Sequence, residues 1–520
     1  MKARILLAFL LFINIISTAQ IQDLAKLADG KLVFNRFLRD NEDKLFGYFF
    51  LYEKNIGTDS VTMEYVLLDK NLNKALNGTF NEPKLKSKFV REYHDCSLLG
   101  NNLVIDKVYI LKRFAGYTTF LLNTFQIINM DSNIVRRELK YNDGQFEPLV
   151  GDFNEILALI KKKEGKPSID LFSGDSISGF LVKMVDSFGK DTLQSKLLFL
   201  DENYNHRWTY IYSPKNDNRN FNYYKVLYSQ GNTMYLGMNN IRNGKYDTYQ
   251  IVAIDLQTGN LKYVYELDNT ELPYQRNFYL REFDGQLNIL GSYTVRESMN
   301  LGYDFTKSQG YYHIRLDSAG NELASRHLPW INYKAKLKLS PEGYDDENYK
   351  LMPRQYYMFK DGSFSILTER YKPDYKGVII PIPIVGAIIQ ASTMKKKHTD
   401  DFILMNFDRD MNLVRLDTIA KEMSKDNITD YHFSEYIHDR EGVVIFYVNS
   451  FKADRKEQVV LGINTVLNGT ITEEKIPLYS KKEFAIYPMP AKEGYVMLRE
   501  VNEKSKHNQI RLEKLNYDAL

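Results

Sequence analysis

Cysteine is nearly absent from this chain of 520 residues, since Cys96 is the only one. An intrachain disulfide is therefore excluded, and a packed core must stabilise the fold by itself. An excess of one charge is missing too, with 69 basic and 66 acidic residues. This balance gives no general attraction to nucleic acid. No apolar run is long enough to span a bilayer as a helix.

Established catalytic and metal-binding patterns are also missing. His94, Asp95 and Cys96 are adjacent, but neighbouring side chains of a strand or loop point apart, which favours a structural role over a nucleophile and its base. His432 and His438 flank Glu435 without the spacing of a zinc motif. We therefore expect no metal and no cofactor, and we assign no catalytic residue.

Acidic residues gather in several short segments. Asp69, Asn71 and Asn73 resemble the start of a calcium loop, as do Asp408, Asp410 and Asn412. Both segments lack the glycine and the glutamate that complete such a loop, so turn formation explains them. Residues 345–347 and the pair at 400–401 would suit acid and base catalysis only at the axis of a ring, and we expect them in solvated loops.

The chain does contain a recurring hairpin, in which an apolar strand, an Asp, a few polar residues with Asn or Gly, and a second strand follow one another. Asp accepts hydrogen bonds from the backbone two residues on, and Asn or Gly provides the positive φ of a tight turn. Successive turns lie 52 to 91 residues apart. They begin at Asp69, Asp131, Asp201, Asp255, Asp317, Asp408, Asn464 and, in a truncated copy, Asn516.

A second pair of strands precedes these hairpins, as in residues 224–238, 278–292 and 356–368. Four meandering strands per unit are typical of a propeller blade. Because blades bury their faces against their neighbours, we expect one ring over residues 20–520 and not several separate domains. The predicted fold is an all-β propeller of about eight four-stranded blades, with seven as the alternative.

The way the ring closes has two interpretations. The chain stops soon after Asn516, so the last unit lacks an outer strand, and residues 28–37 near the N-terminus look like a turn and its second strand. The two ends could complete one blade between them. Alternatively, residues 32–37 form the innermost strand of the first blade, paired with residues 45–52.

The first 19 residues are typical of a signal peptide. Lys2 and Arg4 precede an apolar stretch of 12 residues at 5–16, and Ser17, Thr18 and Ala19 form a small-residue cleavage site. No Cys follows that site to accept a lipid. We expect export to the periplasm or the exterior, without a transmembrane segment.

A helix and an apolar segment interrupt the strands. Residues 152–165 predict a short amphipathic helix, with Asp152 as N-cap and Glu155 in a capping box. We expect this helix to cover an edge or face of the ring, with partner binding as the alternative.

Residues 377–397 form an insertion between the second and third strands of one blade, and its prolines oppose a regular helix or a central strand. It either folds back over a blade edge or stays exposed as a surface for a partner or membrane. The candidate partner-binding residues are Ile379, Ile380, Pro381, Ile382, Pro383, Ile384 and Val385.

Residues 198–208, 311–321 and 402–408, with the signal ending at Gln20, resemble the exported propeller-like proteins of Bacteroidota that carry a domain of unknown function. The resemblance covers most of residues 30–520 and implies no catalytic residues.

Two classes of function remain. The first is a non-catalytic binding protein of the cell envelope, whose loops hold a glycan, a peptide or another envelope protein. The alternative is a secreted polysaccharide-degrading enzyme, a glycoside hydrolase or a lyase, which would need carboxylates on strands that face the axis. We favour binding, because the carboxylates evident in the sequence lie in turns.

Overall fold

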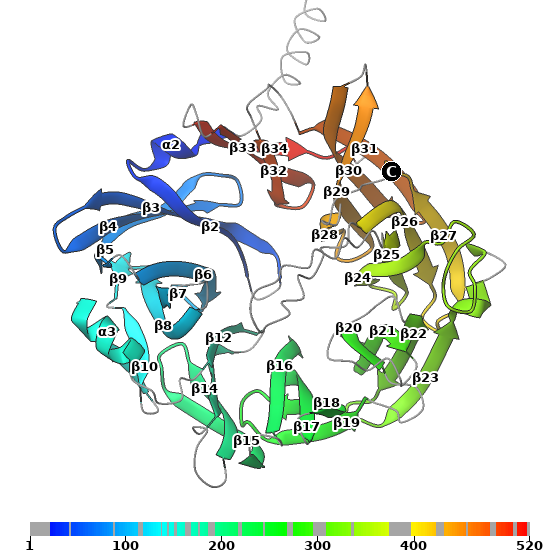
Figure 1. Ribbon diagram of the computed structural model, residues 1–520, viewed down its shortest axis with the longest axis horizontal. Helices are drawn as coiled ribbons and strands as arrows, with labels where there is room; N and C mark the ends of the chain where they lie inside the picture. The colour runs from blue at the N-terminus through cyan, green and yellow to red at the C-terminus, as the bar shows by residue number, and fades with distance from the viewer. Residues whose placement is uncertain are drawn as a thin grey trace, which may run out of the picture.

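Eight antiparallel sheets stand around a common axis in the computed structural model, and together they form a β-propeller (Figure 1). The predicted fold class and the preferred blade number are therefore confirmed. The structure describes residues 21–516, with gaps at 41–42, 87–88, 113–117, 137, 143–144, 150–152, 162–167, 175–176, 186–192, 217–220, 243–244, 268–273, 295–307, 334–336, 374–396, 423–430, 454–455, 479–484 and 503–506.

Each blade is a meander whose strands run in sequence from the axis outward. Blade 1 contains β2 (Lys31–Arg39), β3 (Leu45–Ile56), β4 (Ser60–Asp69) and β5 (Lys74–Pro83). Blade 2 contains β6 (Phe89–Leu99), β7 (Asn102–Lys112) and β8 (Thr118–Asn129), extended by β9 (Ile134–Val135), β10 (Leu139–Asn142) and β11 (Gln145–Pro148). Blade 3 contains β12 (Ser168–Ser173), β13 (Ser178–Val185), β14 (Leu193–Asp201) and β15 (His206–Asn216).

The next four blades follow the same order. Blade 4 contains β16 (Phe221–Gln230), β17 (Thr233–Arg242), β18 (Lys245–Asp255) and β19 (Leu261–Glu266). Blade 5 contains β20 (Tyr274–Phe283), β21 (Gln286–Thr294), β22 (Ser308–Leu316) and β23 (Glu322–Pro329). Blade 6 contains β24 (Lys350–Met358), β25 (Phe364–Pro373), β26 (Lys397–Phe407) and β27 (Leu413–Ile419). Blade 7 contains β28 (Tyr431–Ile437), β29 (Gly442–Ala453), β30 (Lys456–Leu467) and β31 (Thr470–Pro477).

Blade 8 is shared by the two ends of the chain. Its inner strands are β32 (Ala485–Pro490), β33 (Tyr495–Asn502) and β34 (His507–Lys514), and β1 (Ile21–Asp23) supplies the outermost strand. The second interpretation of residues 32–37 is confirmed, because β2 is the inner strand of blade 1 and pairs with β3. The ends do complete one blade between them, but through residues 21–23, which the sequence did not mark as a strand.

The recurring hairpins form as their turn chemistry predicts. The Oδ1 atom of Asp69 accepts hydrogen bonds from the backbone N–H groups of Asn71 and Asn73, at 2.8 Å each. Asp408 accepts the same two bonds from Asp410 and Asn412. The two segments that resemble calcium loops are therefore Asp-anchored turns, as we expected.

The hydrophobic core lies in layers between neighbouring blades. Between blades 1 and 2, for example, Tyr65 and Leu67 of β4 pack with Leu103 and Ile105 of β7. Cys96 belongs to the same layer and is buried, which raises the pKa of its thiol. This layering explains how a chain without disulfides can be stable.

The two faces of the disc differ in the connections between strands that lie on them. Connections from first to second and from third to fourth strands are turns of two to five residues, and because the strands alternate in direction these turns share one face, the turn face. The strand ends that precede and follow the second-to-third and the inter-blade connections lie on the opposite face, the loop face, and are up to 23 residues apart in sequence.

Two short helices and a 3-10 turn also lie on the loop face. They are α2 (Leu24–Leu27), α3 (Phe153–Lys161) and η4 (Trp330–Tyr333). The predicted helix at 152–165 corresponds to α3, which packs against β7 and β8 through Ile156 and so covers part of blade 2. Its predicted N-cap, Asp152, lies outside the described residues, while the carboxylate of Glu155 accepts a hydrogen bond from Lys140. Among the described residues, no helix has the length and apolar character needed to cross a bilayer.

Candidate functional site

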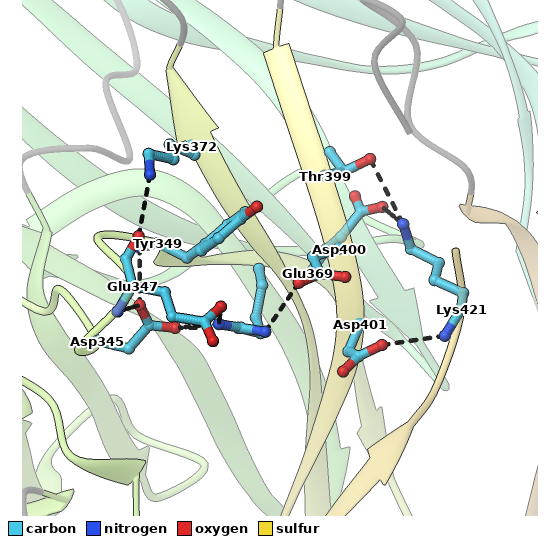
Figure 2. A network of polar contacts seen from close by, with 10 residues as sticks. Asp345, Glu347, Tyr349, Glu369, Lys372, Thr399, Asp400, Asp401 and Lys421 are labelled. Atoms are coloured by element: carbon cyan, nitrogen blue, oxygen red, sulfur yellow. Dashed lines mark hydrogen bonds and ion pairs between the residues drawn. The ribbon is translucent and has the colours of Figure 1, made fainter. Parts of the chain in front are cut away.

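The densest group of charged side chains on the loop face belongs to blade 6 and surrounds Arg370, near the end of β25. Its guanidinium donates hydrogen bonds to three carboxylates, with N–O distances of 2.9 Å to Asp345, 2.8 Å to Asp400 and 2.8 Å to Glu347. Figure 2 labels these three acidic residues. The guanidinium also lies 4.6 Å from the centre of the Tyr349 ring. We call these five residues the Arg370 cluster. It fastens the inter-blade loop before β24 to the ends of β25 and β26.

A second layer of charge is buried beneath this cluster. The side chains of Glu369 and Lys421 are fully buried and form an ion pair of 3.3 Å. Arg354 forms a further ion pair with Glu369, and the backbone N–H of Lys421 donates to Asp401 at 3.0 Å. Figure 2 shows Glu369, Asp401 and Lys421 between the two strands and the segment that follows β27. The layer joins the first three strands of the blade to the segment that follows β27.

The two acidic segments noted in the sequence meet in this cluster, which corrects one expectation. We expected solvated loops, but the side chains of Asp345 and Asp400 are only 10% and 21% exposed, and both are bound by Arg370. Asp346 and Glu347 are each 64% exposed, as expected. Burial raises the pKa of Asp400, and the negative charge of Asp401 adds to that rise. Since Arg370 occupies three of these carboxylates, the cluster is suited to holding strands together and is poorly suited to proton transfer.

The two strands that flank the apolar insertion in the sequence, β25 and β26, both contribute to this cluster. β25 and β26 pair as far as Pro373 and Lys397, which flank residues 374–396 on the loop face. In the sequence, residues 374–396 thus connect the second and third strands of blade 6. The candidate partner-binding residues from Ile379 to Val385 lie outside the described residues.

A second buried ionic network joins the outer strand of blade 1 to blade 2. Lys107 is fully buried and binds Glu82 at 2.7 Å and Glu138 at 2.8 Å, while Arg91 binds Glu82 at 2.6 Å. Burial alone would raise the pKa of Glu82, but Lys107 and Arg91 hold that pKa below its usual value. Buried, neutralised charge is thus present both in blade 6 and between blades 1 and 2.

Three aspartates lie near the axis, and their charges are less completely neutralised than those of the two networks above. Asp95 of β6 is opposite Asp106 of β7, and Asp170 lies on the inner strand of blade 3. Asp95 pairs with Arg36 at 2.9 Å and Asp170 with Lys183, whereas Asp106 accepts a hydrogen bond of 3.2 Å from the neutral amide of Asn123. Burial raises the pKa of Asp106 to about 7, and the charges of Asp95 and Asp170 contribute to the rise.

Sequence reasoning missed this axial group. Its members come from three strands of two blades, and no spacing along the chain relates them. Asp95 had been noted only beside His94 and Cys96, and the structure separates that trio, because Cys96 is buried between blades while His94 is exposed. Within the described residues, no group of three potential ligands could hold a metal ion.

Comparisons with known proteins complete the description of the site. The model of a family of unknown function, DUF6770, matches residues 1–516. No curated protein matches the chain. Among solved structures, the chain is similar to the WD40 domain of SCAP from fission yeast, with 9% identity, a TM-score of 0.38 and 96% of each chain covered.

Two enzymes show a similar degree of likeness. A quinohemoprotein alcohol dehydrogenase from Pseudomonas putida has 9% identity and a TM-score of 0.36, with 96% of this chain and 77% of that chain covered. The polysaccharide lyase Uly1 has 10% identity and a TM-score of 0.37, with 81% of this chain and 89% of that chain covered. At these scores the similarities support no inference about function.

Proposed function

The chain belongs to the family of unknown function DUF6770, and we propose that it is an exported, non-catalytic binding protein of the cell envelope. The proposal assigns binding to the loop face and names the apolar insertion at 377–397 as the contact element. Its ligand is another envelope component, of which a protein, a peptide or a glycan are the classes considered.

The observation that carries this proposal is the attachment of the insertion. It leaves and re-enters blade 6 at strands that Arg370, Asp345 and Asp400 hold together. A buried ion pair reinforces the same strands directly below. Rigid strand ends favour binding, because less conformational freedom is lost when the insertion meets a partner.

Deletion of residues 377–394 tests this proposal. Co-sedimentation with isolated cell envelopes should fall markedly, while the thermal unfolding temperature stays near that of the full chain. A matched control replaces Ile134, Leu261 and Leu323 with serine, because these exposed aliphatic side chains lie on outer strands away from the insertion. Undiminished sedimentation of the deletion variant would refute the role of the insertion, and loss of folding would show that the insertion belongs to the core.

One observation favours the second candidate, a secreted polysaccharide-degrading enzyme. An aspartate with a pKa of about 7, next to two others near the axis, has the electrostatics of a general acid. Purified protein incubated with a panel of glycosides and polysaccharides should give no turnover if binding is the function. Turnover that is abolished by Asp106→Asn would establish the enzyme instead.

A further inference from the structure

A groove opens on the turn face between blades 6 and 7, opposite to the face considered so far. It has a volume of about 730 Å³, within the range of small-ligand and peptide sites. Turns from both blades enclose it, namely those after β24 and β26 in blade 6 and those after β28 and β30 in blade 7. We call it the turn-face groove.

Apolar side chains line the interior of this groove. Phe364 and Phe407 are stacked with ring centres 4.9 Å apart, and both are almost fully buried. Val466 and Leu467 line the blade 7 side. Val414 completes the lining from β27 and is 66% exposed, which is an unusual position for an aliphatic side chain. A ligand that covers Val414 would remove apolar surface from water.

Three acidic and two basic side chains line the groove. Its two cations already have partners, since Arg415 binds Asp417 at 2.7 Å and Lys360 lies 3.5 Å from Asp439 and 3.6 Å from Glu441. Among the described residues, Asp361 and Asp408 accept hydrogen bonds only from neutral N–H and O–H groups, at 2.6 to 3.0 Å. The cation that acts on Asp408 is Arg326 of β23, which forms no ion pair with it among these residues. Burial opposes ionisation of Asp408, but the hydrogen bonds of its turn and the positive charge of Arg326 together lower its pKa, so its charge persists at neutral pH.

The geometry points to an extended peptide with alternating basic and aliphatic residues as the occupant of this groove. We propose that a basic side chain lies beside Asp361 and Asp408 and that an aliphatic side chain covers Val414. Within the described sheet, β27 pairs only with β26. Its other edge can therefore offer backbone N–H and C=O groups to a peptide, which a simple amine could not use. This proposal concerns the turn face and does not depend on the function proposed for the loop face.

The test uses the full mature protein and a short fluorescent peptide of alternating lysine and valine, with a glutamate and valine peptide as the charge control. Fluorescence anisotropy should show saturable binding of the lysine peptide alone, weakened by added salt. The double variant Asp361→Asn, Asp408→Asn should weaken binding about fivefold, because it removes two exposed charges. Asn keeps a side-chain oxygen that can accept the bonds of the turn.

Two matched controls separate the groove from general effects. Asp201→Asn with Asp255→Asn makes the same charge change in blades 3 and 4, in two turns equivalent to that of Asp408, and should leave the affinity unchanged. Val414→Ser should weaken binding, whereas Leu323→Ser, at the equivalent place in β23, should not. The proposal is overturned if the lysine peptide does not bind, if both peptides bind equally, or if the control variants weaken binding as much as the groove variants.

Discussion

Residues in the left-handed region show how the turns and the blade interfaces depend on each other. Leu72 and Met411 occupy the fourth position of their Asp turns with φ of 63° and 64°, and both side chains are buried between blades. Gly320 takes this position in blade 5, with φ of 85°, and a Cβ there would lie 2.4 Å from the ring of Tyr263. In blade 5, the ring of Tyr263 from the neighbouring blade 4 thus occupies the space that the side chain of the turn residue occupies in blades 1 and 6.

The axial aspartate gives a prediction at the same scale. The folded-state pKa of Asp106 is about 7, above the unfolded value of about 4, so the folded protein binds the proton more tightly. This residue therefore lowers stability progressively as the pH rises from about 4 to 7. Asp106→Asn should stabilise the fold by about 1–3 kcal/mol at pH 8 and have little effect at pH 4.

Urea denaturation of the wild type and of Asp106→Asn at both pH values measures this difference. Asp317→Asn is the control of opposite sign, because hydrogen bonds from Asn321 lower the pKa of Asp317 in the folded protein. The Asp317→Asn substitution should lower the free energy of unfolding at pH 8. An Asp106→Asn variant that is destabilised at pH 8 would contradict the prediction.

Among the structural elements, the short N-terminal strand and α2 decide whether the ring is closed. β1 contributes three residue pairs with β34, and Leu24 at the start of α2 is fully buried. The hydroxyl of Tyr52 in blade 1 donates to the carbonyl oxygen of Leu24 at 3.0 Å. Leu24 also packs with Met497 and Leu512 of blade 8, so this one side chain joins the last blade to the first.

We therefore predict that Leu24→Ala destabilises the protein by about 2–4 kcal/mol, the usual cost of a cavity at a buried leucine. Lys26→Ala changes an exposed residue of the same helix, with a side chain 84% exposed, and should change stability by less than about 0.5 kcal/mol. Urea midpoints measure both variants. Equal effects of the two substitutions would show that α2 does not secure the closure.

At the scale of the whole molecule, some polar contacts connect blades that are not neighbours in the ring. Arg39 of blade 1 binds Glu435 of blade 7, although blade 8 lies between them in the ring. Arg440, in the turn after β28, donates to the carbonyl oxygen of Met358 in blade 6 and to the hydroxyl of Tyr279 in blade 5. These contacts join the ends of inner strands at the turn face across five of the eight blades.

Loss of the first of these contacts should destabilise the ring in a pH-dependent way. Burial raises the pKa of Glu435, and Arg39 opposes that rise. Arg39→Ala leaves the carboxylate partly buried without its cation, so we expect a loss of about 1–3 kcal/mol at pH 8. The loss should be smaller at pH 4, where Glu435 is largely protonated.

Urea denaturation at both pH values is the measurement, with Arg39→Lys as the control that retains the charge. The lysine variant should lose less stability than the alanine variant at pH 8. A loss that is the same at pH 4 and pH 8 would show that packing of the arginine, and not its charge, matters.

The local sequence alone determined the repeating part of this protein. Turns anchored by Asp69 or Asp408 depend on hydrogen bonds within a few residues, and strands depend on alternation along the chain, so the blades and the helix at 153–161 could be predicted.

Only the tertiary structure decided which side chains meet across blades. It brought Asp345 to Arg370, Asp106 to Asp170 and Ile21 to Arg511. It also formed the groove between blades 6 and 7. Such contacts depend on how the sheets twist and pack around the axis, and no spacing along the chain records that geometry.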